Sequence, residues 1–407
     1  MSDAGVIIVG AGHGGGTAAA LLRQYGYAGP IRLIGEEPAI PYQRPPLSKA
    51  WLKGETDAET LSLKPESFYP EAGIELITAR RVAEIEPAAR AVRLEDGARF
   101  SYDHLILATG AKARPLPVPG ADLAGVLSLR TAADAEALKA RLGPGKRLAV
   151  IGGGYIGLEV AASARALGSE AVVIEKEARI LARVACPALS DFFTDYHRAR
   201  GVAFEVAADV IALEGADGQV TGVRLGAERV IACDVVLIGV GAPPDQSLAA
   251  GAGLACQNGV VVDAEARTED EAIFAIGDVT WRPMPLYHRM FRLESVANAL
   301  EQARQAACAI AGRPQPTPEV TWNWSDQYDL KYQFAGVPFD ADQVLVRGDP
   351  ADAKFAVFHL KGDVILAVEA VNAAAEFMGG RQLIGQKRPV DPARLADITV
   401  SMKEVAA

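Results

Sequence analysis

The motif Gly-x-Gly-x-x-Gly occurs twice in this chain of 407 residues, each time between an apolar run and an alanine-rich run. The first copy, Gly10-x-Gly12-x-x-Gly15, follows "VIIV", which predicts a buried parallel strand over residues 6–9. The second copy, Gly152-x-Gly154-x-x-Gly157, follows "RLAVI" about 140 residues later. Glycines at these positions let the backbone approach a pyrophosphate at the N-terminus of the next helix. Two such contexts predict two dinucleotide-binding α/β units, unless one copy is only a structural turn.

An acidic residue follows each motif at the end of the next predicted strand. "IRLIGEE" is expected to end at Glu36 and "EAVVIEKE" at Glu175, each a little more than the roughly 20 residues expected after the motif. This acid accepts hydrogen bonds from a ribose, and its charge repels the 2′-phosphate of NADPH. Glu175 therefore favours NADH. The cations Lys176 and Arg179 follow closely in the sequence, so the strictness of the preference for NADH over NADPH stays open.

Three further segments predict how the two units are joined. "YDHLILATGAKARPLPVPG" indicates a buried strand that ends at Ala108-Thr109-Gly110 and leaves through prolines, and "CDVVLIGVGAPPD", with Gly241, is its counterpart in the second unit. "AIFAIGDVT" then predicts an apolar strand running into Gly277-Asp278. A carboxylate at the carboxyl end of a strand, where open α/β sheets bind ligands, suits a sugar-alcohol hydroxyl such as that of FAD ribitol. The first unit is thus interpreted as the FAD site and the second as the nicotinamide site.

The segment "IPYQRPPLSKAWLKGE", residues 40–55, is unusual so soon after a strand. Its prolines fix φ and remove backbone donors, so it is expected to be a rigid loop. It carries Arg44 and Lys49 but no sulfur. In an arbitrary loop Lys49 would be a solvated surface lysine.

Composition restricts the function classes. The net charge of −10, without long runs of one sign, argues against general binding to nucleic acid or membranes. The four cysteines form no CxxC pair and the five histidines are isolated, so neither a redox dithiol nor a metal site is predicted. The first apolar run turns glycine-rich at once and no stretch approaches about 20 apolar residues, which predicts a soluble, cytoplasmic protein.

The order of these motifs, together with "PYQRPPLSK", "GGGYIGLEVAA", "ESVANALEQAR" and "WSDQYDLKYQFAG", resembles the NADH-dependent, FAD-containing ferredoxin reductases of bacterial cytochrome P450 and Rieske dioxygenase systems. The resemblance runs from about residue 5 to residue 400. It implies an α/β fold with two Rossmann-like domains of the glutathione-reductase type and an α+β C-terminal domain. The implied FAD-binding domain is discontinuous, residues 1–112 and 242–316, around an NADH-binding domain of residues 113–241. Residues 317–407, where apolar and polar residues alternate before a short helix near 373–386, form the C-terminal domain.

The resemblance also implies the site. Its FAD-side residues are Gly10, Gly12, His13, Gly14, Gly15, Glu36, Arg44, Lys49, Val82, Ala108, Arg130, Asp278, Val296 and Trp324. Its NADH-side residues are Gly152, Gly154, Ile156, Gly157, Glu175 and Gly241. Lys49 is implied to lie beside the flavin, paired with Glu159, where disulfide reductases of the same superfamily carry a cysteine pair. Glu159 could otherwise be an exposed acid in the first turn of its helix.

The resemblance implies electron transfer from NADH through FAD to a [2Fe–2S] ferredoxin. From composition and spacing, no metal site and no nucleic acid or membrane partner is expected. Three alternatives remain. A rubredoxin reductase would share nearly every motif and differ at the acceptor surface. A peroxide- or CoA-disulfide-reducing NADH oxidase would need a cysteine near residues 40–50, which is absent. A flavoprotein resembling apoptosis-inducing factor would act chiefly by binding, and the charge of −10 speaks against the basic surface that nucleic acid requires.

Overall fold

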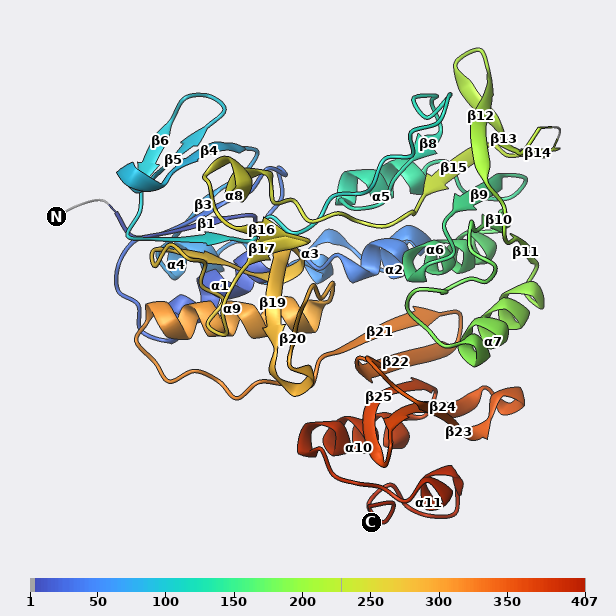
Figure 1. Ribbon diagram of the computed structural model, residues 1–407. Helices are drawn as coiled ribbons and strands as arrows, with labels where there is room; N and C mark the ends of the chain where they lie inside the picture. Colours follow the sequence, from blue (N-terminus) through green and yellow to red (C-terminus); the bar gives the residue numbers. More distant parts are fainter. Residues whose placement is uncertain (1–3, 228, 407) are drawn as a thin grey trace.

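The computed structural model describes residues 4–227 and 229–406. In Figure 1 these residues form three lobes. The first lobe combines the blue N-terminal segments with the gold and orange segments up to α9 (Val296–Ile310), the second is green, and the third is the red C-terminal region.

The first lobe is built on a parallel sheet with the strand order β18-β7-β1-β2-β3. Register is regular, with Val6 opposite Ile31 and Val9 opposite Ile34. Its middle strand, β1, is apolar and buried along its whole length because both faces of the sheet are covered. Helices α1 (His13–Gln24) and α9 pack on one face, and a small antiparallel sheet packs on the other. The central strands are β1 (Val6–Val9), β2 (Ile31–Ile34), β3 (Ile74–Ile77), β7 (His104–Leu107) and β18 (Ile273–Ala275), and the covering sheet is β4 (Val82–Glu86), β5 (Ala91–Leu94) and β6 (Arg99–Ser101).

Strand β18 pairs in parallel with β7 although well over a hundred residues separate them. The chain therefore leaves the first lobe after β7, forms the second lobe, and returns to complete the first sheet. On its return it also forms a four-stranded sheet of β16 (Cys256–Gln257), β17 (Gly259–Val261), β19 (Thr280–Met284) and β20 (Arg289–Phe291). Short helices α2 (Ala50–Lys53), α3 (Ala58–Leu61), α4 (Phe68–Glu71) and α8 (Ser247–Gly251) connect these parts.

The second lobe repeats this architecture with the parallel order β11-β10-β9-β15-β8. Helix α6 (Tyr155–Ala166) follows the second glycine motif as α1 follows the first, and it is buried along most of its length. The strands are β8 (Val126–Leu127), β9 (Arg147–Ile151), β10 (Glu170–Ile174), β11 (Val202–Glu205) and β15 (Val235–Ile238). They are accompanied by α5 (Ala132–Lys139), α7 (Pro187–Arg198) and an antiparallel sheet of β12 (Val210–Ala216), β13 (Gln219–Leu225) and β14 (Arg229–Ala232).

The third lobe is a five-stranded antiparallel sheet in the order β21-β22-β25-β24-β23, packed against α10 (Ala374–Gln386). The predicted antiparallel strands and the helix near 373–386 are thus confirmed. The strands are β21 (Trp322–Gln327), β22 (Leu330–Gly336), β23 (Gln343–Asp349), β24 (Lys354–Lys361) and β25 (Val364–Val371), followed by α11 (Pro392–Ala396).

The predicted fold class is confirmed, with small corrections at strand ends. Strands β2 and β10 end at Ile34 and Ile174, so Glu36 and Glu175 lie just beyond the strands rather than in them. One residue past β2, the Gly35 N–H donates to the Ile77 carbonyl oxygen at 2.8 Å, and its own carbonyl oxygen accepts from the Arg80 N–H at 3.0 Å. In the described part of the chain, no helix has the length and apolar character that crossing a membrane requires.

Candidate functional site

One cavity of about 2040 Å³ runs between the three lobes and is lined by both glycine motifs. Every predicted site residue except Gly15 lines this cavity. The segments that converge on it also include the proline loop, the Ala108-Thr109-Gly110 turn, Gly277-Asp278 and the start of α9. The structure therefore brings together residues that lie up to about 300 positions apart in the sequence.

The first glycine motif leaves room for a ligand on one side only. Gly10 has φ of +110°, and a Cβ there would lie 2.2 Å from the Ala108 carbonyl oxygen. A Cβ on Gly15 would lie 1.9 Å from the Gly10 carbonyl oxygen, which explains why Gly15 is buried beneath the turn rather than at the cavity. Gly12 faces the cavity instead, and the nearest atom to a Cβ there would be Arg44 Nε at 3.9 Å. A polyphosphate can thus approach the backbone at Gly12, close to a guanidinium.

The second motif has the same construction. Gly152 has φ of +108° and a Cβ there would lie 2.4 Å from the Gly239 carbonyl oxygen. A Cβ on Gly157 would lie 2.3 Å from the Gly152 carbonyl oxygen, whereas a Cβ on Gly154 would meet no other atom within 4 Å. Both turns therefore present an open backbone at a helix N-terminus, which fits a dinucleotide pyrophosphate in each.

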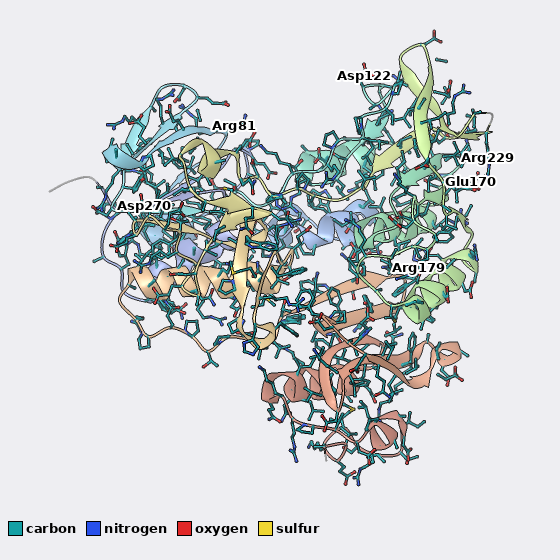
Figure 2. The ribbon with its side chains drawn as sticks, viewed as in Figure 1. Arg81, Asp122, Glu170, Arg179, Arg229 and Asp270 are labelled. Atoms are coloured by element: carbon teal, nitrogen blue, oxygen red, sulfur yellow. The ribbon has the colours of Figure 1, made fainter. Side chains whose placement is uncertain are left out.

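The acids beyond the two strands differ in setting. The Glu175 carboxylate accepts hydrogen bonds from the Gly153 N–H at 2.7 Å and the Glu177 N–H at 2.9 Å, so it is oriented at the second glycine turn. Glu36 is more exposed and lies 3.8 Å from Arg81 Nε. Figure 2 labels Arg81 on the first lobe, close to β4. The Lys176 ammonium lies 3.7 Å from Asp209 Oδ1 in an exposed ion pair, so it does not neutralise the charge of Glu175.

The proline loop presents a half-buried cation to the cavity. Pro45–Ser48 form a short 3₁₀ turn, and the loop ends at Lys49. The Lys49 ammonium lies 2.7 Å from Glu159 Oε2 and 3.1 Å from the Pro45 carbonyl oxygen, and its side chain is 17% exposed. Glu159 is buried, not an exposed first-turn acid. The predicted pairing of these two residues is present in the structure, whereas their role beside a flavin stays a prediction.

Glu159 is held by groups from other lobes. Ser48 Oγ donates to Glu159 Oε2 at 2.5 Å, and Ser325 Oγ on β21 donates to Oε1 at 2.6 Å. Gln327 Nε2 donates to Ser325 Oγ at 3.1 Å and its Oε1 lies 2.7 Å from His197 Nε2 on α7. Burial lowers the pKa of His197 to about 4. The ion pair thus stands at one end of a hydrogen-bonded chain that joins all three lobes.

Sequence reasoning did not assign Ser48, Ser325, Gln327 or His197 to the site. Serine, glutamine and a lone histidine carry no spacing signal of their own, and Ser325 lies 166 positions from Glu159. Ser325 and Gln327 do lie within the quoted segment "WSDQYDLKYQFAG". Alternation along β21 places both on the face that packs toward α6.

Arg130, just before α5 of the second lobe, forms an ion pair at 3.0 Å with Asp278 of the first lobe on the cavity wall. His13 lies beside the first glycine turn, where burial and the nearby Arg44 guanidinium lower its pKa to about 4. His13 is therefore neutral at pH 7 and can donate or accept a hydrogen bond without adding charge.

Helix α9 directs its N-terminus at the cavity. Ser295 caps it by accepting the Asn298 N–H at 3.1 Å, and Val296, its first residue, lines the cavity. The remaining free N–H groups and the helix dipole make this end favourable for negative charge. Trp324, which also lines the cavity, packs on Trp322 with ring centroids 5.5 Å apart. Cys186, Cys233, Cys256 and Cys308 are all free, so the chain has no disulfide.

Comparison with known proteins gives consistent matches over nearly the whole chain. The family described as "Pyridine nucleotide-disulphide oxidoreductase" matches residues 4–303, and "Reductase C-terminal" matches residues 322–406. A probable ferredoxin reductase, CtmF, of Castellaniella defragrans is 54% identical over 402 residues, covering 98% of each chain. Rubredoxin-NAD(+) reductase of Pseudomonas putida is 40% identical, covering 90% of this chain and 95% of its own.

Among solved structures, the reductase chain of a covalent putidaredoxin reductase–putidaredoxin complex superposes with a TM-score of 0.97. It is 39% identical, and the match covers 100% of this chain and 98% of that one.

Proposed function

The chain belongs to the family of pyridine nucleotide-disulphide oxidoreductases, and from this premise we propose that it is an FAD-dependent NADH:ferredoxin oxidoreductase. The observation that carries the proposal is the wall of the cavity at residues 45–49. The half-buried Lys49 pairs there with the buried Glu159, and the segment contains no cysteine pair for a thiol relay. With FAD bound, these residues would hold and charge-stabilise the cofactor without a thiol relay, so the electron acceptor would lie outside the chain.

We assign the first glycine motif to FAD. Gly10, Gly12 and Gly14 with Arg44 would hold the pyrophosphate, and Glu36 a ribose. Asp278, fixed by Arg130, would bond the ribitol chain. Val82, Ala108, Val296 and Trp324 would surround the remainder, with the α9 N-terminus favouring the negative charge that the ring gains on reduction.

We assign the second motif to NADH. Gly152, Gly154 and Gly157 would hold its pyrophosphate, with Ile156 and Gly241 on the same wall. Glu175 would accept the ribose hydroxyls and repel the 2′-phosphate of NADPH.

Bound FAD supplies the chemistry, because it accepts a hydride and releases its electrons one at a time. The side chains contribute orientation and charge. The Lys49 ammonium stabilises negative charge in the cavity, and Glu159, fixed by Ser48 and Ser325, holds that ammonium in place. No general base is needed, since hydride leaves NADH without proton abstraction.

The proposed domain division follows the strand pairing. Residues 1–112 and 242–316 would form the FAD domain, because β18 completes the sheet of β7. Residues 113–241 would form the NADH domain and 317–407 the C-terminal domain. We place the enzyme in the cytoplasm, where NADH is available, serving a [2Fe–2S] ferredoxin that feeds a cytochrome P450 or a Rieske oxygenase.

The test is an acceptor panel with the purified holoenzyme. NADH oxidation is followed with [2Fe–2S] ferredoxins and with rubredoxin, using cytochrome c as the final acceptor, and with disulfides as a third class. We expect ferredoxin-dependent turnover that far exceeds the rate without carrier. Faster turnover with rubredoxin would favour the rubredoxin reductase that one relative's name describes. Disulfide reduction would contradict the proposal.

A further inference from the structure

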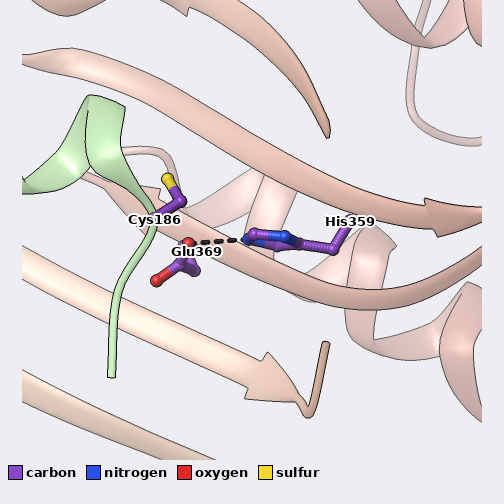
Figure 3. A group of neighbouring side chains, drawn as sticks. All are labelled: Cys186, His359 and Glu369. Atoms are coloured by element: carbon purple, nitrogen blue, oxygen red, sulfur yellow. Dashed lines mark hydrogen bonds and ion pairs between the residues drawn. The ribbon is translucent and has the colours of Figure 1, made fainter. Parts of the chain in front are cut away.

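Three side chains with metal-binding groups meet where the second and third lobes contact each other. Figure 3 shows Cys186, which precedes α7, facing His359 on β24 and Glu369 on β25. His359 pairs with Ala367 across the strands, so Glu369 is its diagonal neighbour on the same sheet face. His359 Nε2 lies 2.7 Å from Glu369 Oε2, and one ligand atom of each residue lies within 4.8 Å of the others. All three side chains are buried.

We propose that these residues form a binding site for a Zn²⁺-class cation. Thiolate, imidazole and carboxylate are the donors that zinc takes in proteins, usually in tetrahedral geometry. Zinc–ligand bonds of roughly 2.0–2.3 Å at tetrahedral angles put nitrogen and oxygen about 3.3 Å apart, and sulfur and nitrogen about 3.6 Å apart. In the structure, nitrogen and oxygen lie 2.7 Å apart and all three ligand atoms lie within 4.8 Å of one another, so the nitrogen and oxygen would separate by about 0.6 Å around a bound cation.

The surroundings complete the site. Tyr332 donates its hydroxyl to Glu369 Oε1 at 2.8 Å, which orients the carboxylate and leaves Oε2 toward the cluster. The Tyr155 hydroxyl lies 3.3 Å from that of Tyr332 and donates to the Val184 carbonyl oxygen at 3.0 Å. Hydrogen-bonded outer partners of this kind orient ligands in known metal sites. Within the described residues, no lysine or arginine forms an ion pair with Glu369, so a divalent cation would balance the thiolate and the carboxylate.

The site borders the large cavity. Cys186, His359 and Glu369 all line it, and the cavity would give access to the cation and to a water molecule as fourth ligand. Nearby, Arg179, labelled beside α7 in Figure 2, donates to the Ala182 and Ala185 carbonyl oxygens and fixes the turn that carries Cys186.

Metal binding would replace one proton. On binding, the S–H bond breaks, the Zn–S bond forms, and the proton passes to solvent. His359 must then present the lone pair of Nε2 to the cation. The bound cation links the loop before α7 to the C-terminal sheet.

The test is titration of the chelator-treated holoenzyme with Zn²⁺ alone, followed by calorimetry. We expect one cation per chain, with a dissociation constant in the micromolar range or tighter. Cys186→Ser and His359→Gln should each weaken binding by more than about 100-fold, beyond the 10- to 100-fold typical of outer partners. Cys256→Ser is the matched control, because Cys256 is partly exposed and does not line the cavity. It should leave the affinity unchanged.

A second measurement does not depend on the variants folding. Cd²⁺ titration of the unaltered holoenzyme should give a thiolate-to-metal charge-transfer band that saturates at one equivalent. Absence of this band, or Zn²⁺ affinity that survives in Cys186→Ser, would overturn the proposal. FAD absorbance and thermal unfolding are measured for each variant. They show whether Zn²⁺ affinity is lost because a metal-binding side chain was removed or because the variant does not fold. None of these readouts requires an electron acceptor, so they stand apart from the test of the proposed function.

Discussion

Replacing Lys49 by methionine should lower the reduction potential of the bound flavin. At 2.7 Å, Lys49 and Glu159 attract each other by roughly 6 kcal/mol at an effective dielectric of about 20, before desolvation is subtracted. In the unaltered protein Glu159 therefore offsets much of the lysine charge. Methionine keeps the length of the side chain but leaves the carboxylate uncompensated, so the cavity becomes more negative by one full charge. If reduced flavin loses about 1.4 kcal/mol of stabilisation, the two-electron potential falls by roughly 30 mV.

The assay is a spectroelectrochemical titration with stopped-flow reduction by NADH alongside. Glu159→Gln should shift the potential weakly or upward, since it removes an anion and keeps the cation. The double variant removes both charges and should recover most of the shift of Lys49→Met. Lys49→Met leaves the buried Glu159 carboxylate without its cation, which should cost up to about 3–5 kcal/mol of stability, so FAD content is checked first. If Lys49→Met binds FAD fully and leaves both the flavin reduction potential and the rate of reduction by NADH unchanged, Lys49 has only a structural role.

Four further outcomes are expected. The enzyme should prefer NADH to NADPH by a large factor in kcat/KM, and equal kcat/KM values for the two cofactors would contradict the role of Glu175. Glu175→Gln should lower kcat/KM for NADH about tenfold or more, since a charged hydrogen bond contributes roughly 1.5–3 kcal/mol. Alkylating the cysteines of the native enzyme, of which Cys256 is the most accessible, should leave flavin reduction by NADH unchanged. Ser325→Ala should lower the free energy of unfolding by about 1–3 kcal/mol, measured by denaturant titration, because a buried carboxylate loses a donor. Burial lowers the pKa of His197 to about 4, so as the pH is lowered from 6.5 to 4 the unfolded chain binds a proton that the folded chain does not. The free energy of unfolding should therefore fall by on the order of 3 kcal/mol over this pH range. His197→Gln should reduce this pH dependence.

The fold could be predicted from the sequence where a local pattern of apolar residues and glycines determines the local structure. Val6–Val9 forms the predicted strand, because a short apolar run before a glycine turn can adopt few other structures. Glycine is required in the turns because of positive φ values and close backbone contacts. The strand ends were less predictable, since Glu36 and Glu175 follow apolar runs closely but lie just beyond Ile34 and Ile174, where β2 and β10 end.

The site was predictable only where a motif marks the residue. The Lys49–Glu159 pair followed from the resemblance, whereas Ser325 and His197 reach it through packing between lobes that no local spacing encodes. The same holds for Cys186, His359 and Glu369: isolated residues in the sequence argued against a metal site, yet strand pairing and the docking of α7 bring them together.

The central claim is that this chain passes electrons singly from NADH to a [2Fe–2S] ferredoxin without a thiol relay. The most direct measurement is anaerobic double-mixing stopped flow. Holoenzyme reduced by one equivalent of NADH is mixed with excess oxidised ferredoxin, and the flavin and iron–sulfur absorbances are followed together. We predict that reoxidation of the flavin coincides with reduction of two ferredoxin molecules for each NADH, and that prior alkylation of the cysteines changes neither rate nor stoichiometry. Flavin that stays reduced in the presence of ferredoxin, or transfer that stops after alkylation, would contradict the account.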